Sequence, residues 1–299
     1  MRALVAEMRR FAPSDANVLI TGETGVGKDA VARALHAMGG RSDEPFVTVD
    51  CPGLPASLLE AELFGYERGA FTDAAVSRAG RFELAASGTI YLDRVHELPP
   101  ELQAKLLRLV EHKQVERLGT AVAVPVKARI VASAADLIED AVESGTFRTD
   151  LYHRLRVLPL RVPPLRQRRA DLRFLVQHFL RAAARRAGRP APTLTPGARA
   201  RLAAHTWPGN VRELQHTLDR AVLATTASLI EADDLPIETA PADSLFGGTD
   251  QPRPTLEEIE RRYIELVLHE TRGSQTRAAR VLGISRKALW EKRKRFGLS

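Results

Sequence analysis

The segment VLITGETGVGKDAVARALH, residues 18–36, constrains the fold more than any other part of the sequence. A short apolar run suited to a strand leads into a glycine-rich turn, and a helical segment follows. In such a turn the backbone N–H groups and the helix N-terminus face phosphate oxygens, while the lysine reaches the β and γ phosphates. The alternative is an ordinary glycine turn before a helix. We predict a nucleotide site formed by Gly22, Glu23, Thr24, Gly25, Val26, Gly27 and Lys28.

Two acidic residues belong to the same predicted site. Asp29 stands where the general P-loop pattern has Ser or Thr, so the usual hydroxyl ligand for magnesium is missing. The apolar run 89–92 delivers Asp93 to the carboxyl end of a strand, where a nucleotide-binding sheet places the acid that holds Mg²⁺. We therefore expect ATP and Mg²⁺ as cofactors, with Asp93 as the metal ligand.

Bulk properties describe an ordinary soluble chain. Its 299 residues, 44% of them hydrophobic, suffice for a large core and about two or three domains. No apolar run approaches the roughly 18 residues of a membrane span, and the start MRALVAEMRRF lacks the features of a signal peptide. We expect a cytoplasmic protein without a membrane partner. The single cysteine, Cys51, excludes an internal disulfide and is expected to be buried rather than reactive.

The chain divides into segments of different character. Residues 17–160 alternate β-rich runs with helical segments, the pattern of a parallel sheet covered by helices. From PPLRQRR onward the strands stop, and helices are predicted at 170–185, 196–204 and 210–226. A stretch rich in proline then has linker composition. The predicted units are an α/β domain at 1–162, a helical subdomain at 163–235, a linker at 236–254 and a small all-α domain at 255–299.

The C-terminal unit carries most of the net charge. Residues 253–299 contain twelve Lys or Arg and six Glu, which is +6 of the chain's +7. Its segment TRAARVLGISRKALWEKRKRFG predicts a helix, a turn at Gly283 and a second helix capped by Ser285, a helix-turn-helix. Such a charge concentration favours a surface for double-stranded DNA, although a solvated face is the alternative. The residues expected to contact DNA are Ser285, Arg286, Lys287, Lys292, Arg293, Lys294 and Arg295.

Apolar residues of this unit are expected to serve packing. In TLEEIERRYIELVLHE, a helical stripe suited to dimer contacts comprises Leu256, Ile259, Tyr263 and Val267. Ile264 and Leu268 broaden this stripe. In the segment of the two following helices, we expect the apolar residues to pack in the core rather than to contact DNA bases; they are Ala279, Leu282, Ile284, Leu289 and Trp290.

Eight motifs in order resemble those of the AAA+ bacterial enhancer-binding proteins, which activate transcription by sigma-54 RNA polymerase. The resemblance covers nearly the whole chain and rests on TGETGVGKD, ELFGYERGAFTDA, GRFELAASGTIYLD, LPPELQAKLLRLVEHKQVERLG, FRTDLYHRL, PPLRQRRADL, WPGNVREL and TRAARVLGISRKALWEKRKRFGL. It implies an AAA+ P-loop domain with a helical lid and a Fis-type helix-turn-helix. An acidic residue follows the P-loop lysine in this family, so Asp29 is a mild departure.

The resemblance also implies roles for three arginines. Arg148 and Arg154, in FRTDLYHRL, are similar to arginines supplied across a subunit interface to the neighbour's nucleotide. This implies a homo-oligomer that forms a ring through the AAA+ domain, in addition to a dimer through the C-terminal domain. Arg212, in WPGNVREL, matches the lid arginine that reads the nucleotide of its own subunit. The alternative for each arginine is a surface ion pair.

A loop resembles the one that contacts sigma-54 in this family, which implies a sigma factor as partner. It comprises Gly69, Ala70, Phe71, Thr72, Asp73 and Ala74. The pair that would touch the sigma factor, Phe71 and Thr72, is kept, whereas Asp73 replaces a glycine and adds both a charge and a Cβ. The bare residues alone indicate only a glycine-containing turn with an exposed phenylalanine.

Three parts of the hydrolytic apparatus differ from the family pattern. The family has a Glu that orients water directly after the magnesium aspartate, and an Asn on the neighbouring strand that restrains it; here the residues are Arg94 and Asp50. The segment RIVASAADL, 129–137, is one residue shorter and has Ala where a Thr-Asn pair would sense the γ-phosphate. Because a positioned base contributes about 10² to 10⁴ in rate, we expect nucleotide binding with weak hydrolysis. The alternative is a fully active ATPase that remodels sigma-54 polymerase.

Two carboxylates are candidates for a substitute base, Asp50 ahead of Glu97. We predict instead that Asp50 and Arg94 form an ion pair at the strand ends, because a lone buried cation would be costly. On ATP binding, Arg94 is expected to turn toward the γ-phosphate. Since the P-loop begins within about twenty residues of Met1, regulation is expected from a partner protein or from a longer chain of which this is a part.

Overall fold

The computed structural model describes residues 1–72, 74–225, 227–237, 255–271 and 274–297. Two compact units are present, one made of Met1–Pro192 and Trp207–Ser228, the other of Thr193–Thr206 and Leu229–Ser299. Two predicted features fall on the remaining residues: Asp73 and most of the expected linker, from residue 238 to 254, lie outside the described ranges.

A five-stranded parallel sheet forms the centre of the first unit, in the order β2-β5-β8-β1-β9. The strands are β1 (Val18–Thr21), β2 (Phe46–Asp50), β5 (Thr89–Asp93), β8 (Arg129–Ala134) and β9 (Leu158–Arg161). All six residues of β8 and the first four of β5 are buried, as expected for parallel strands covered on both faces. The predicted α/β sheet is confirmed.

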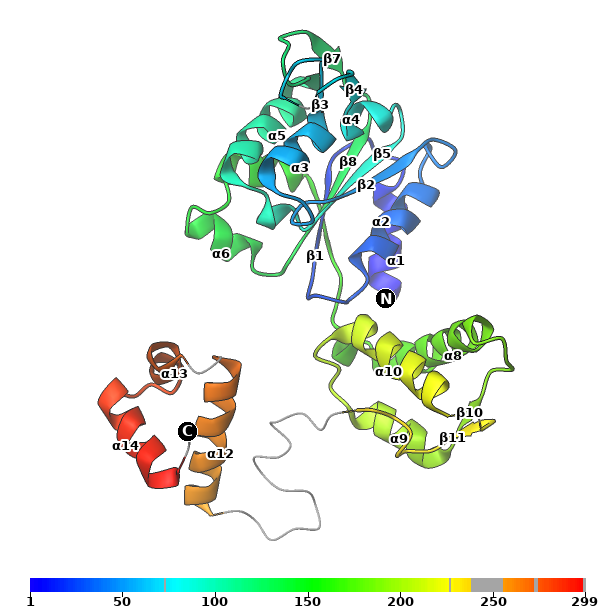
Figure 1. Ribbon diagram of the computed structural model, residues 1–299. Coiled ribbons are helices and arrows are strands. Elements are labelled where there is room, and N and C mark those ends of the chain that lie inside the picture. Colours follow the sequence, from blue (N-terminus) through cyan, green and yellow to red (C-terminus); the bar gives the residue numbers. More distant parts are fainter. Residues whose placement is uncertain (73, 226, 238–254, 272–273, 298–299) are drawn as a thin grey trace. The chain divides into compact units, whose positions relative to one another are not determined.

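Helices cover the two faces of this sheet (Figure 1). On one face, α1 (Arg2–Phe11) and α2 (Lys28–Ala37) pack against residues of β1 and β5 that include Tyr91. On the other face lie α3 (Ala56–Phe64), α5 (Pro100–His112) and α7 (Thr149–Leu155), packed against Ile90 and Leu92. Alternate strand residues thus serve opposite cores. Shorter helical segments are α4 (Arg81–Leu84), η1 (Val95–Glu97) and α6 (Ile138–Glu143).

Cys51 belongs to the second of these cores, where only 1% of it is exposed. Burial raises the pKa of its thiol to about 12, so it is inert at neutral pH. The prediction of a buried cysteine is confirmed.

Two short hairpins extend from one end of the first unit, and the sequence did not predict them. Strand β3 (Gly65–Tyr66) pairs with β4 (Arg78–Ala79), and β6 (Gln114–Glu116) pairs with β7 (Ala123–Pro125). A bridge between Tyr66 and Leu118 joins the two hairpins. The pairs have only two or three residues per strand, which is too short for a periodic apolar pattern to reveal them.

The helices that follow the sheet match the predicted ranges closely. Helix α8 (Arg169–Arg186) packs against α10 (Asn210–Ala224) within the first unit, preceded by η2 (Leu165–Gln167). In the second unit, α9 (Pro196–Ala204) is capped by Thr195 and lies near the parallel pair β10 (Thr193–Leu194) and β11 (Leu229–Ile230). The expectation that strands stop after residue 163 is therefore wrong for this two-residue pair.

The C-terminal part of the second unit is a three-helix helix-turn-helix. It contains α12 (Leu256–Glu270), α13 (Gln275–Val281) and α14 (Arg286–Phe296). Ser285 caps α14 by accepting the N–H of Ala288 at 3.1 Å, as predicted. The helices enclose a small core of Ile264, Val267, Ala278, Ala279 and Leu289.

One packing expectation for this unit needs correction, and another stays a prediction. Leu256 and Tyr263 of α12 are 86% and 44% exposed while Val267 lies in the core, and the use of this stripe for dimer contacts stays a prediction. Trp290 is 55% exposed and is not a core residue. A three-helix unit this small has room inside for only part of its apolar side chains.

Across the described residues, no helix combines the length and apolar character that a membrane crossing requires.

Candidate functional site

The glycine-rich turn between β1 and α2 has the conformation of a phosphate-binding loop. Gly25 and Gly27 have φ of 78° and 98°, which favour glycine, and Gly27 is the N-cap of α2. The Lys28 Nζ donates to the carbonyl oxygens of Gly22 and Glu23, at 2.7 and 3.1 Å. The N-terminus of a ten-residue helix and a lysine thus converge on one turn, which suits an anion.

The Lys28 ammonium lies in a partly dehydrated environment. Burial lowers its pKa, and the negative charges of Asp93 and Asp136 offset part of that shift. Charge attraction is stronger where water is excluded, so this environment favours a tight contact between lysine and phosphate.

The carboxylate of Asp93 is held by two hydroxyl groups. The Tyr91 hydroxyl donates to Asp93 Oδ1 at 3.0 Å, and Ser133 Oγ donates to the same oxygen at 2.5 Å. Among the described residues, none donates a hydrogen bond to Oδ2. Sequence reasoning missed both hydroxyls, although the alternation of strand side chains places Tyr91 on the same face of β5 as Asp93.

The donor set fits a magnesium ion bound together with a nucleotide. Mg²⁺ commonly takes one or two carboxylates and completes its coordination with phosphate oxygens and water. Asp93 supplies one carboxylate oxygen beside Lys28, and within the described ranges no three His, Cys, Asp or Glu side chains form a metal site of their own. Asp29 pairs with Arg33 one turn along α2 at 3.0 Å, and its place in the nucleotide site stays a prediction.

Arg94 and Asp50 form the predicted ion pair at the carboxyl ends of adjacent strands. Arg94 Nη2 lies 2.6 Å from Asp50 Oδ1, and the β2–β5 register aligns Asp50 with Asp93. Arg94 also lies 3.8 Å from Glu97. Both carboxylates considered as substitute bases therefore face the arginine, and the hypothesis of an ion pair is confirmed.

The backbone of Arg94 is unusual. Its φ of 56° and ψ of 46° are left-handed, a conformation that costs a non-glycine residue about 1–3 kcal/mol. The Arg94 N–H donates to Ser133 Oγ at 3.1 Å, which holds the turn in place. Close by, Nδ1 of His96 is buried and has no hydrogen-bond partner among the residues that the structure describes, and burial lowers the pKa of that imidazole.

The P-loop is also bonded to the segment that leads into the lid helices. Arg166 donates to both carboxylate oxygens of Glu23, at 2.8 and 2.5 Å, and Asn210 Nδ2 donates to Glu23 at 3.1 Å. The hydrogen bonds from Arg166 are the main cause that lowers the pKa of Glu23 to about 2. Arg168 adds a 2.7 Å bond to the Val26 carbonyl. The sequence analysis identified the motifs PPLRQRR and WPGNVREL but assigned no role to Arg166, Arg168 or Asn210.

Asn210 is the centre of this connection. It is fully buried and left-handed, with φ of 55°, which asparagine tolerates better than most residues. Its Oδ1 accepts the Leu165 N–H at 2.8 Å, and its Nδ2 donates to the Thr24 carbonyl at 3.1 Å. Arg212 follows two residues later with an exposed side chain, and its N–H donates to the Gly25 carbonyl at 3.2 Å. Its charge contributes to the field at Lys28.

The two arginines of FRTDLYHRL lie at the start and near the end of α7. Arg148 pairs with Asp150 at 2.8 Å, and Arg154 pairs with Glu111 at 3.0 Å. Their side chains are 47% and 61% exposed. Within the described residues neither has a hydrogen bond to the P-loop of its own chain. Their position leaves both guanidinium groups on the surface.

The described residues of the loop between β3 and β4, 69–72 and Ala74, are joined by backbone hydrogen bonds. The N–H of Gly69 donates to Ala74 O, and the N–H of Ala74 donates to Phe71 O, both at 2.9 Å. Phe71 is 42% exposed while its ring lies 4.9 Å from that of Tyr66, and Thr72 is exposed. The loop thus presents a partly supported phenylalanine to solvent.

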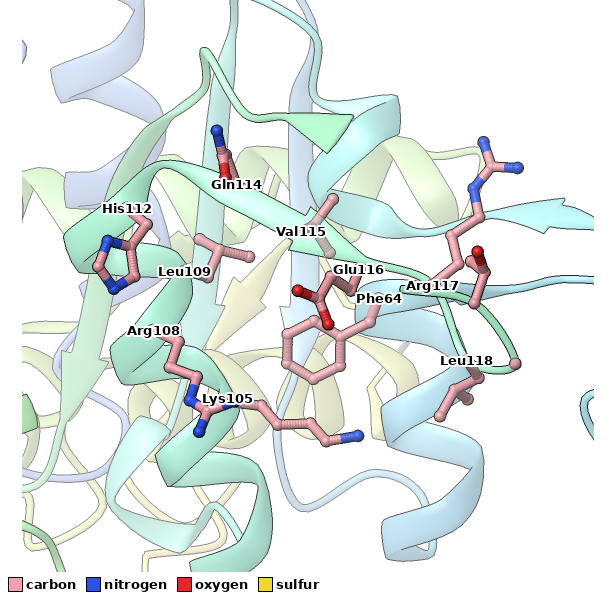
Figure 2. A pocket seen from close by; sticks show the side chains of 12 residues that line it. Phe64, Lys105, Arg108, Leu109, His112, Gln114, Val115, Glu116, Arg117 and Leu118 are labelled. Carbon is pink, nitrogen blue, oxygen red and sulfur yellow. The ribbon is translucent and has the colours of Figure 1, made fainter. Parts of the chain in front are cut away.

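Arg117 follows β6 and connects the second hairpin to the residue after β3 and to α4. It donates to Glu67 at 2.9 Å and to both oxygens of Glu83, at 2.8 and 2.7 Å. Below it lies a pocket of about 320 Å³ between α5 and β6, in which Phe64 and Leu109 form apolar walls (Figure 2). Lys105 lies at the rim of this pocket and is paired with Glu60.

The helix α14 presents its charges unequally. Arg286, Lys287 and Lys294 are exposed, and Lys294 Nζ lies 5.5 Å from the centre of the Trp290 ring. In contrast, Lys292 pairs with Glu260, and Arg295 pairs with Glu257 at 2.5 Å. The Nε of Arg293 is buried and has no hydrogen-bond partner in the described part of the chain. The second helix of the motif therefore keeps a basic surface, but part of its charge is neutralised by α12.

The parallel sheet with its P-loop, the lid helices and the helix-turn-helix together define a AAA+ protein with an attached DNA-binding fold. The chain matches the sigma-54 interaction domain over residues 1–161, the AAA+ ATPase lid domain over 166–245 and the bacterial regulatory protein Fis family over 255–296. It belongs to the family of sigma-54-dependent transcriptional regulators.

Relatives and solved structures agree with this assignment. The chain is 44% identical to the transcriptional regulatory protein ZraR of Salmonella typhimurium over 98% of its length, and 40% identical to the regulatory protein AtoC of Escherichia coli over 100%. It spans 66% of the length of each. The crystal structure of NtrX from Brucella abortus in complex with ATP is similar over 100% of this chain and 68% of that one, at 37% identity and a TM-score of 0.73. The complex of NtrX with ADP gives 35% identity and a TM-score of 0.74, covering 99% of this chain and 68% of that one.

Proposed function

We propose that this chain is a DNA-binding transcription regulator whose AAA+ domain binds ATP with Mg²⁺ and hydrolyses it slowly. Solved complexes of NtrX with ATP and with ADP support the nucleotide. The observation that carries the slow hydrolysis is the Arg94–Asp50 pair of 2.6 Å, located where a water-orienting carboxylate would be required. A guanidinium remains protonated in proteins and cannot accept a proton from water.

Different residues are proposed to bind the phosphates, the metal ion and the rest of the nucleotide. The backbone N–H groups from Gly22 to Gly27 and the N-terminus of α2 hold phosphate oxygens, and Lys28 adds a positive charge. Asp93 holds Mg²⁺, which when bound neutralises negative charge on the phosphates. Arg212 lies over Gly25 and is proposed to read the nucleotide in its own subunit.

Partners follow from the exposed elements. We propose double-stranded DNA for α14, sigma-54 for the loop at 69–74, and a homo-oligomer in which Arg148 and Arg154 reach a neighbour's nucleotide. The oligomer would combine a ring through the AAA+ domain with dimers through the C-terminal domain. The working units proposed are residues 1–162 with the lid at 163–235, and the DNA-binding domain at 255–299 after the linker.

One observation favours a second candidate function. Phe71 and Thr72 are exposed in the loop between β3 and β4, as a protein that remodels the sigma-54 polymerase complex would need. In this alternative the chain is a fully active ATPase, and another group must orient the water.

Steady-state ATP turnover of the assembled protein tests the two candidates. ATP affinity is measured separately by calorimetry, with Lys28→Ala as the variant expected to lose both binding and turnover. Slow hydrolysis predicts tight Mg²⁺·ATP binding with turnover about 10² to 10⁴ below that of a relative with Glu after its magnesium aspartate. Turnover equal to such a relative would refute slow hydrolysis and favour the second candidate.

A further inference from the structure

Two fully buried hydroxyl groups meet at one oxygen of Asp93. Tyr91 lies two residues earlier on β5 and Ser133 lies on the adjacent strand β8, and the relative exposure of each is 0%. Their hydrogen bonds to Oδ1 measure 3.0 and 2.5 Å. Each hydroxyl has one proton to donate, and both protons are directed at the same carboxylate oxygen.

We propose that Tyr91 and Ser133 are positioning residues that fix the Asp93 carboxylate and present its Oδ2 to Mg²⁺. This inference rests on the proposed binding of nucleotide with Mg²⁺. The two donors occupy Oδ1, and a carboxylate held at one oxygen can rotate only by breaking both bonds. Partners of this kind commonly change metal affinity by about 10- to 100-fold when removed.

Ser133 performs a second task with the same oxygen atom. While its proton goes to Asp93, its Oγ accepts the N–H of Arg94 at 3.1 Å. That bond holds the left-handed turn from which the Arg94 side chain reaches Asp50. One hydroxyl therefore links the orientation of the metal ligand to the position of the arginine.

The burial of Ser133 makes this link specific. A displaced serine hydroxyl would leave the Arg94 N–H and its own buried proton without their present partners, which is unfavourable. The Asp93 carboxylate and the Arg94 turn are consequently coupled: a change at one is transmitted to the other through a single side chain.

The test measures how much Mg²⁺ strengthens ATP binding to the full chain. Calorimetric titrations with ATP are run in excess Mg²⁺ and in EDTA, and the ratio of the two dissociation constants is the readout. For Ser133→Ala and Tyr91→Phe, we expect this ratio to fall about tenfold while affinity in EDTA stays unchanged. Thr89→Val is the matched control, because it removes a buried hydroxyl from the opposite end of β5, where it bonds to His36.

The outcomes separate this inference from the proposed function. If wild-type protein binds ATP more tightly with Mg²⁺ and both variants keep the wild-type ratio, the positioning role is refuted and nucleotide binding stands. If the wild type binds no ATP, or binds it equally in EDTA, the proposed function fails and the inference with it. Should Ser133→Ala not fold, Tyr91→Phe decides the question alone, since it removes one oxygen and keeps the ring.

Discussion

Replacing Asp50 by Asn and Arg94 by Glu in one chain should raise ATP turnover. The double change removes the ion pair at the ends of β2 and β5 and installs a carboxylate directly after Asp93. The backbone at position 94 is already left-handed in the wild type, with φ of 56°, so the substitution adds no further backbone strain.

The magnitude follows from the exposure of the pair. The side chains of Arg94 and Asp50 are 43% and 50% exposed, so losing their attraction costs about 0.2–1 kcal/mol and the variant should fold. A positioned base is worth about 10² to 10⁴ in rate, or about 2.7–5.4 kcal/mol at 1.36 kcal/mol per factor of ten. Because the segment around Ala134 also lacks the family's γ-phosphate sensor, we expect a gain of only about 10- to 100-fold.

The assay is phosphate release at saturating Mg²⁺·ATP, at a protein concentration at which the chain is assembled. Arg94→Gln is the matched control, because it removes the cation without supplying a base and should leave turnover near the wild-type value. Lys28→Ala sets the background. A double variant that folds and binds ATP, yet turns over within twofold of wild type, would refute the view that Arg94 limits hydrolysis.

Three further outcomes are expected. Asn210→Ala should cost about 2–4 kcal/mol of stability in thermal unfolding by leaving buried partners unbonded, and Asn210→Gly should recover only the part due to its left-handed backbone. The pKa of Glu23 falls from 4.5 to about 2, so its contribution to the free energy of unfolding is complete above pH 4.5 and is lost as the pH falls toward 2. Glu23→Gln should lower the free energy of unfolding by about 1 kcal/mol at pH 7, a figure discounted because Arg166 is partly exposed. In urea unfolding, the variant should also lose stability less steeply than the wild type between pH 4.5 and 2. Lys294→Gln should reduce the salt slope of DNA binding by about 1, whereas Lys292→Gln should change it less because Lys292 is already paired; equal slopes for both variants would contradict this.

The strands could be predicted from short apolar runs, and the ion pair from the family resemblance. That resemblance places the positions of Asp50 and Arg94 on neighbouring strands, and the carboxyl ends of neighbouring parallel strands meet at one edge of a sheet. The two side chains were therefore expected to lie close together.

The connections that the sequence did not reveal are those set by register or by side-chain packing. Ser133 meets Asp93 only because β8 pairs with β5 in one particular register, which a single strand does not encode. Asn210 reaches Glu23 from 187 residues away. The apolar character of Trp290 predicts a core position, but this residue lies on a side of α14 that faces solvent.

The close approach at Gly25 has a mechanical consequence. A Cβ at this position would lie 2.3 Å from the carbonyl oxygen of Gly209, so the phosphate-binding turn and the start of α10 touch backbone to backbone. Two N–H groups at the start of α10 donate to the Gly25 carbonyl, at 2.9 and 3.2 Å. Displacing α10 from the turn would break both bonds, together with the bonds from Asn210 to Glu23 and Thr24. The phosphate-binding turn and the first residues of this fifteen-residue helix are therefore joined mechanically, so that a shift of the turn carries the start of α10 with it.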